Sequence, residues 1–217
     1  MNKIKTAGNE FGPNLIEETI HSKLKFTLLY STDITGNSQI NFISNRTVEN
    51  YSDPQEVTFL NSEFEDLYPT FNQDNSRIYF CSNRNGKNFN IYYVNVDPNM
   101  DIESLLSDTS DYEVFLDETL SSNADDKCPF IFENKMVFAS NRTGGYGGYD
   151  LYYSIFKNGK WSEPTNFESK INTEFDEFRP ALIDEWVSST QTMMMFSSNR
   201  PGGLGGVDLY FVGIKNE

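Results

Sequence analysis

The sequence is poor in cysteine, histidine and long apolar runs. Its two cysteines, Cys81 and Cys128, are too few for a disulfide framework, so we expect two free buried thiols, although a single bridge between them stays an alternative. The only histidine, His21, leaves little basis for a Ser-His-Asp arrangement. No run of 18 apolar residues occurs, which argues against a membrane-spanning helix.

Positive charge is also scarce. Lys and Arg total 17 against 32 Asp and Glu, so the formal net charge is −15. Phosphate binding requires surplus basic side chains, and this balance argues against a nucleic-acid partner. The first 15 residues contain no apolar stretch typical of a signal peptide. We therefore expect a cytoplasmic protein, or an exported one whose signal was trimmed.

Aromatic residues and internal repetition are what the sequence has in abundance. With 18 Phe and 12 Tyr, the composition favours strands. Four segments share an acid three residues before a proline, an apolar run that ends in Ser, a polar or glycine-rich gap, and a second apolar run. The acids and prolines are Glu10 and Pro13, Asp66 and Pro69, Asp126 and Pro129, and Glu177 and Pro180. The serines are Ser31, Ser82, Ser140 and Ser198, at spacings of 51, 58 and 58 residues.

These runs predict an all-β fold, a four-bladed β-propeller closed near the termini. They are short, nearly continuously apolar and bounded by turn residues, as in strands that are buried on both faces of a blade. We expect outer strands at about 55–60, 112–117 and 161–167, and residues 2–6 beside the last strand to close the ring. The whole chain, 1–217, is expected to be one domain, with blades at about 8–62, 63–120, 121–172 and 173–217 plus 1–7.

A glycine-rich element occurs twice in the sequence, as SNRTGGYGGYDLYY from Ser140 and as SNRPGGLGGVDLYF from Ser198. A phosphate loop needs a following helix and usually a Lys, and the calcium nonapeptide needs its Asp one place earlier. We therefore predict hairpin loops whose glycines adopt positive φ. Each hairpin is expected to be pinned by an arginine that meets the first residue of the next strand: Arg84 with Asn90, Arg142 with Asp150 and Arg200 with Asp208. Asp33 and Gln39 take these places in the first repeat.

Residues 126–211 resemble the WD40-like repeats called PD40, which are found in TolB-type propellers and in bacterial envelope proteins associated with the OmpA family. The matching segments are FASNRTGGYGGYDLYYS, the following NGKWSEPTNFESKINTEFDEFRP, and MFSSNRPGGLGGVDLYF. The match is fair over 66–96 and weak over 10–60. The resemblance implies a propeller, usually periplasmic or outer-membrane-associated, that contacts proteins or glycans. It brings no catalytic residues with it, because the shared motif is structural.

The repeated charges are the candidate site. In a propeller, the loops that enter the first strand and the hairpins after the second lie at one end, so acids and arginines are expected to surround the channel there. The candidate ligand-binding residues are Glu10, Asp66, Asp126, Glu177, Arg84, Arg142, Arg200 and Tyr146. Three alternatives stay open: salt bridges between blades, a glycan or basic ligand, or a cation such as calcium held by Asp66, Asp126 and Glu177. Tyr146 and Tyr149 offer rings for a sugar or an interface, unless Tyr149, like Val207, packs inward.

Residues 97–126 contain ten acids and no base. We expect a solvated loop, with a docking strip for a basic partner as the alternative.

From these observations we expect a monomeric, non-catalytic binding or scaffold module of a bacterial cell envelope that contacts a protein or glycan. We expect no cofactor other than calcium. Two alternatives stay open: a glycosidase or lyase that uses channel carboxylates, and a purely structural repeat of a larger envelope protein. The acids occupy equivalent places in every repeat, whereas acid–base catalysis needs two carboxylates in different environments, which disfavours the enzyme.

Overall fold

The computed structural model describes residues 7–20, 22–34, 36–47, 50–188 and 190–215. The chain folds into two compact units. The first contains residues 1–87 and 92–115, and the second contains residues 88–91 and 116–217. No helix among the described residues is long and apolar enough to cross a membrane.

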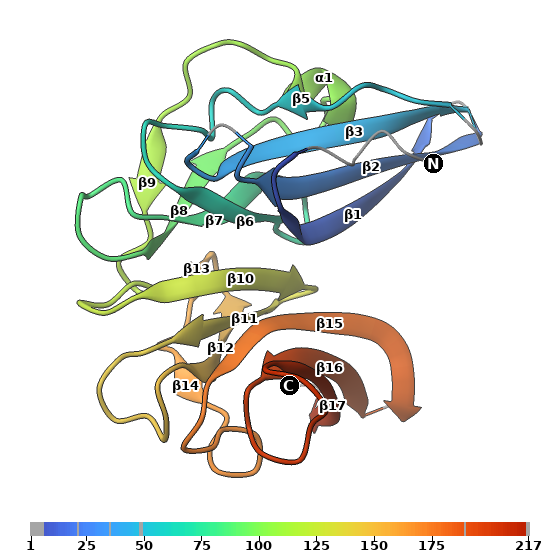
Figure 1. Cartoon of the computed structure of the whole chain (residues 1–217). Coiled ribbons are helices and arrows are strands. Elements are labelled where there is room, and N and C mark those ends of the chain that lie inside the picture. The colour runs from blue at the N-terminus through green and yellow to red at the C-terminus, as the bar shows by residue number, and fades with distance from the viewer. Residues whose placement is uncertain (1–6, 21, 35, 48–49, 189, 216–217) are drawn as a thin grey trace. The chain divides into compact units, whose positions relative to one another are not determined.

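Four antiparallel sheets follow one another along the chain (Figure 1), and we call them blades 1 to 4. Blade 1 comprises β1 (Glu10–Ile20), β2 (Lys23–Thr32), β3 (Gln39–Thr47), β4 (Asn50–Tyr51) and β5 (Gln55–Glu56). Blade 2 comprises β6 (Asp66–Phe71), β7 (Arg77–Ser82), β8 (Asn90–Asn95) and β9 (Val114–Leu116). Blade 3 comprises β10 (Asp126–Phe132), β11 (Lys135–Ser140), β12 (Asp150–Lys157), β13 (Lys160–Trp161) and β14 (Thr165–Asn166). Blade 4 comprises β15 (Glu177–Ser188), β16 (Gln191–Ser198) and β17 (Asp208–Lys215).

The predicted fold class, an all-β four-bladed β-propeller, is confirmed. The outer strands fall within the expected segments but are only two or three residues long. The segment expected to close the ring, residues 2–6, lies outside the described residues.

The repeated proline marks a β-bulge in the first strand of every blade. The pairing register shifts between Phe11 and Asn14 in blade 1 and at the matching places in the other three. The residue before each proline has positive φ, and these residues are Gly12, Tyr68, Cys128 and Arg179. Proline has no N–H to donate, so it is tolerated where the ladder is interrupted. The acid two residues earlier is thereby held at the start of the strand.

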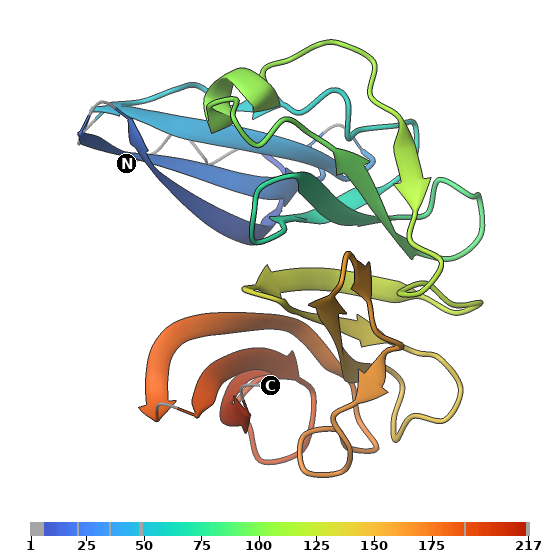
Figure 2. The same cartoon turned by 180° about the vertical axis from the view of Figure 1, so that it is seen from behind.

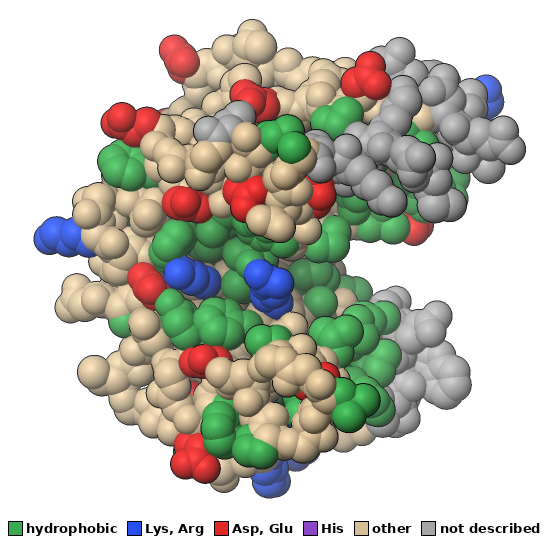
Figure 3. All heavy atoms as spheres, in the orientation of Figure 1, with side chains coloured by type: hydrophobic (Ala, Val, Ile, Leu, Met, Phe, Trp, Pro, Cys, Tyr) green, Lys and Arg blue, Asp and Glu red, His purple; other side chains and the backbone are tan. Residues whose placement is uncertain are grey.

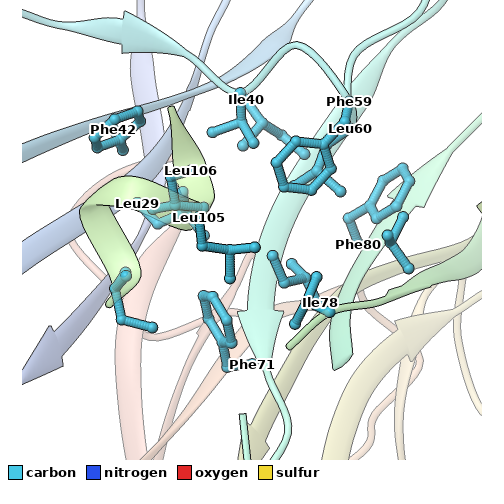
Figure 4. Packing of buried hydrophobic residues seen from close by; sticks show 14 of the residues in the cluster. Leu29, Ile40, Phe42, Phe59, Leu60, Phe71, Ile78, Phe80, Leu105 and Leu106 are labelled. Atoms are coloured by element: carbon cyan, nitrogen blue, oxygen red, sulfur yellow. The ribbon is translucent and has the colours of Figure 1, made fainter. Parts of the chain in front are cut away.

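In the first unit, the core forms between the apolar faces of blades 1 and 2. Its cluster includes Leu29, Phe42, Ile78 and Phe80. Figure 4 shows Leu105 and Leu106, from the short helix α1 (Ile102–Leu106), directed among these strand residues. Figure 2 shows the same helix from behind.

The helix α1 changes the interpretation of the acidic segment 97–126. Three of its apolar residues, Ile102, Leu105 and Leu106, are buried, and Asp101 caps its first turn by accepting a hydrogen bond from the Ser104 N–H. Lys25 of β2 lies 2.9 Å from Glu103. The prediction of a solvated loop was wrong for this part of the segment, because its leucines are needed to fill the core.

The second unit has its own core, built from blades 3 and 4. Its cluster includes Val137, Leu151, Leu182, Met194 and Phe196. Both cysteines are buried thiols outside any disulfide, Cys81 in the first unit and Cys128 in the second, as expected.

Candidate functional site

Each of blades 2, 3 and 4 contains the same buried ion pair. In blade 3, the guanidinium of Arg142 donates to Asp126 Oδ1 at 2.6 Å and to the Leu120 carbonyl at 2.7 Å, while its Nε donates to Ser140 Oγ at 3.0 Å. The Asp126 side chain is fully buried, whereas that of Arg142 is 17% exposed. The pair therefore connects the start of β10 to the end of β11 in a charge-assisted network.

The guanidinium also lies over two aromatic rings. The Arg142 carbon is 5.2 Å from the ring centre of Phe138 and 5.0 Å from that of Tyr152. Both distances are within the range of cation–π attraction. The second carboxylate oxygen of Asp126 accepts hydrogen bonds from the N–H and the hydroxyl of Ser122, at 2.6 and 2.8 Å. Both carboxylate oxygens of Asp126 thus have partners inside the protein.

Blades 2 and 4 repeat this network. Arg84 meets Asp66 at 2.6 Å in blade 2, and Arg200 meets Glu177 at 2.9 Å in blade 4. The aromatic rings below are Phe80 and Tyr92 in blade 2, and Phe196 and Tyr210 in blade 4. The hydroxyls that bind the acids come from Ser62 and Thr173.

This geometry corrects the predicted arginine partners. The arginines bind the acid of the first strand, and not Asn90, Asp150 or Asp208 at the start of the third. Asp150 instead accepts from the N–H groups of Tyr146 and Gly147, and so holds its own glycine loop. The sequence spacing could not separate these options, because Asp126 and Asp150 lie opposite the same residue, Ser140, on either side of β11.

The alternative of salt bridges between blades is likewise corrected, because each pair joins two parts of one sheet. Among the described residues, no group of three or more His, Cys, Asp or Glu side chains is arranged to hold a metal ion. Glu10, the acid of blade 1, is half-buried.

The glycine loop of blade 3 is structural, as predicted, but the expected positive φ is found at only one of its four glycines, Gly144. Gly147 is required for another reason, because a Cβ there would collide with the carbonyl oxygen of Phe175. Tyr149 packs inward: its hydroxyl donates to Asp125 at 2.6 Å and its ring contacts Phe178. The equivalent Val207 of blade 4 is 64% exposed, so the prediction that it also packs inward was wrong.

Tyr149 and Asp125 perturb each other. Burial and the hydrogen bond to the Asp125 carboxylate raise the pKa of the Tyr149 phenol. Burial opposes ionisation of Asp125, but the hydrogen bonds from Tyr149 and from the Phe89 N–H, with Lys127 nearby, lower the pKa of its carboxyl group. The amine of Lys127 lies 4.0 Å from the ring centre of Phe89. This cluster has no counterpart in the predicted site.

The glycine-loop ends of blades 3 and 4 expose large apolar side chains. Leu204 is fully exposed, and Tyr146 is 45% exposed with its hydroxyl donating to Glu168. Leu209 and Phe211 of β17 are exposed as well. Figure 3 shows acidic side chains scattered over the visible face, in keeping with the net charge.

No family model matches the sequence. No curated protein matches it either. Solved structures do match. A thermostable family-43 glycoside hydrolase superposes with a TM-score of 0.63 at 14% identity, over 96% of this chain and 72% of that one. An endo-arabinase from Bacteroides thetaiotaomicron gives 0.63 at 13% identity, over 94% and 75%. The chain has a β-propeller fold.

TolB from Acinetobacter baumannii also matches, with a TM-score of 0.44 at 17% identity, over 93% of this chain and 43% of TolB. At 13–14% identity, the two matches with a TM-score of 0.63 establish the fold alone, because one propeller fold serves unrelated functions.

Proposed function

We propose that this propeller is a non-catalytic binding module of the PD40 type that contacts a glycan or a protein through the glycine-loop ends of its blades. The observation that carries the proposal is the exposure of Tyr146, Leu204 and Val207 on loops whose neighbouring charges are bound internally. Large apolar side chains gathered on the surface of a soluble protein are typical of interaction sites. The resemblance to PD40 repeats supports a place in the bacterial envelope as part of the same proposal.

A carbohydrate-active enzyme is the second candidate, and the family-43 glycoside hydrolase among the structural neighbours is the observation in its favour. Its difficulty is the state of the repeated carboxylates. Asp66, Asp126 and Glu177 are fully buried, and each is bound by an arginine. A glycosidase needs one carboxyl group that gives up a proton and another that attacks or activates water, both in contact with the sugar.

The test measures, by isothermal titration calorimetry, the binding of arabino-, β-1,3-galacto- and xyloglucan oligosaccharides. We compare the wild type with L204S/V207S and with the control L15S/L24S, which changes two exposed leucines of the β1–β2 hairpin. We expect one oligosaccharide class to bind, its Kd to rise about tenfold or more in L204S/V207S because apolar contact is lost, and the control to bind as the wild type does.

The other outcomes are equally informative. Binding that is unchanged in L204S/V207S would remove the glycine loops from the site. New reducing ends after incubation would establish the enzyme instead. If no oligosaccharide binds, the same variant pair is used to compare proteins retained from envelope extracts, and equal retention by both variants contradicts the proposed surface.

A further inference from the structure

Blade 4 ends in an edge strand. In the part of the chain that the structure describes, this blade has three strands, whereas each of the others has four or five. Its last strand, β17, therefore has a strand partner on one side only (Figure 1). The backbone N–H and C=O groups along the open edge of a sheet can pair with a strand from another chain.

In blades 1 to 3, one polar side chain holds the backbone of the second residue of the third strand. In blade 3, the Leu151 N–H donates to Asn172 Oδ1 at 2.8 Å, and the Leu151 carbonyl accepts from the Asn172 amide at 2.9 Å. The Phe167 N–H donates to the same carbonyl at 3.2 Å. The equivalent pairs are Asn61 with Ile40 in blade 1 and Ser121 with Ile91 in blade 2. The segment after the third strand thus completes this edge in three blades.

Leu209 is the equivalent residue of blade 4. The register places Leu209 of β17 where β12 has Leu151, because each follows the aspartate that pairs with the last serine of the second strand. Leu151 is fully buried, whereas Leu209 is 77% exposed. Within the described ranges, no side chain stands beside Leu209 as Asn172 stands beside Leu151.

The aromatic residue two places further along the strand differs in the same way. Tyr153 of blade 3 contacts Phe167, with ring centres 4.9 Å apart, and Tyr93 of blade 2 contacts Phe115 at 5.3 Å. Phe211 takes this position in blade 4 and is 78% exposed. The edge of β17 therefore offers both backbone groups and an uncovered aromatic ring.

The N-terminal sequence of the chain does not repeat the asparagine that holds this edge in blade 3. Residues 3–6, KIKT, resemble residues 170–173, KINT, but Lys5 stands at the place of Asn172. A lysine side chain donates hydrogen bonds and has no acceptor for the Leu209 N–H. This difference favours a segment of a separate chain at the edge.

We propose that the edge of β17 binds an extended peptide segment of another protein, which adds an outer strand to blade 4. The segment carries an aromatic side chain that covers Phe211, followed by an asparagine whose amide holds the backbone of Leu209. Main-chain hydrogen bonds to the edge contribute affinity, and the two side chains contribute specificity. This proposal does not depend on the glycine-loop function.

A peptide copied from blade 3 tests the site. Its sequence, EPTNFESKINT, is that of residues 163–173 and includes Phe167 and Asn172. Fluorescence anisotropy of the labelled peptide measures its binding to the intact chain. We expect saturable binding, and we expect the Kd to rise about tenfold or more in peptides with N172L or F167S, because each loses contacts with the edge. No saturable binding, or an equal Kd for the three peptides, would overturn the proposal.

Two variants of the chain test the same contacts from the other side. F211S removes the exposed ring, and L209P removes an N–H group at a place where an edge strand tolerates proline. We expect each to raise the Kd of the peptide about tenfold or more and to leave the Tm near that of the wild type, because both side chains are exposed. The control L24S changes an exposed leucine of the β1–β2 hairpin and is expected to bind as the wild type does. Peptide binding by F211S equal to that of L24S would contradict the proposal.

Two further results would assign the edge to a different occupant and overturn the proposal. Light scattering during size-exclusion chromatography would reveal a second copy of the chain, as a dimer that F211S converts to a monomer. Peptide binding that is absent in the wild type and present in I4D would show that the N-terminal segment of the chain fills the edge.

Discussion

At the scale of single residues, the repeated arginine and acid are best understood as one internal unit. The Asp126 carboxylate is fully buried and accepts hydrogen bonds from Arg142 and Ser122. A buried ion pair of this kind contributes little to the stability of the fold when compared with apolar residues of the same volume. Removing one partner, however, leaves an uncompensated buried charge, which is strongly destabilising.

We therefore predict that R142M lowers the free energy of unfolding by about 3–5 kcal/mol, measured by urea denaturation at pH 7. The control K157M removes a cation from an exposed position at the end of β12 and is expected to change it by less than about 0.5 kcal/mol. The double variant R142M/D126N should recover part of the loss, since no charge is left buried. A loss in R142M no larger than that in K157M would show that the pair is dispensable.

The sequence was enough to identify the acid and the arginine as candidate residues, but not to predict that they bind each other. The acid, the serine and the arginine were visible because they recur with the repeat. The direction of the arginine side chain at the end of the sheet decides which carboxylate it binds. That direction depends on the pairing of β10 with β11, which brings Arg142 to Asp126, 16 residues earlier in the chain.

At the scale of elements, the two glycine loops have the same sequence pattern but different surroundings. In blade 3, a Cβ on Gly147 would collide with backbone oxygens of Thr173 and Phe175. In blade 4, a Cβ on the equivalent Gly205 would have its nearest contact at 3.8 Å, with the carbonyl oxygen of Val207. The pattern therefore reflects close packing of backbone in one blade and an open surface in the other.

This difference predicts unequal effects of one substitution. G147A is expected to lower the free energy of unfolding by about 1–3 kcal/mol, because backbone must move to make room for the methyl group. G205A is expected to be neutral or slightly stabilising, because alanine restricts the unfolded chain. Thermal unfolding of the two variants side by side measures both effects. If G147A and G205A lowered the free energy of unfolding equally, both glycines would be required for the same backbone conformation.

At the scale of the whole molecule, the charge balance of −15 is the dominant electrostatic feature. Like charges repel one another in the compact state and weaken it. The buried arginine–acid pairs are screened much less than the surface charges, because salt ions do not reach them.

We predict that the Tm rises when NaCl is increased from 0.01 to 0.1 M, which shortens the Debye length from about 30 to about 10 Å. The difference in Tm between the wild type and R142M should stay constant over the same range. Differential scanning calorimetry checks both. A Tm that falls with salt would show that surface pairs, such as Lys25 with Glu103, outweigh the repulsion.

The sequence by itself determined the propeller class and the first strand of each blade at its acid–proline segment, because these depend on local backbone preferences that recur with the repeat. Only the tertiary structure decided the arginine partners, the close backbone packing at Gly147 and the burial of α1. Those features depend on register and on contacts between residues far apart in the chain, which a repeat pattern does not specify.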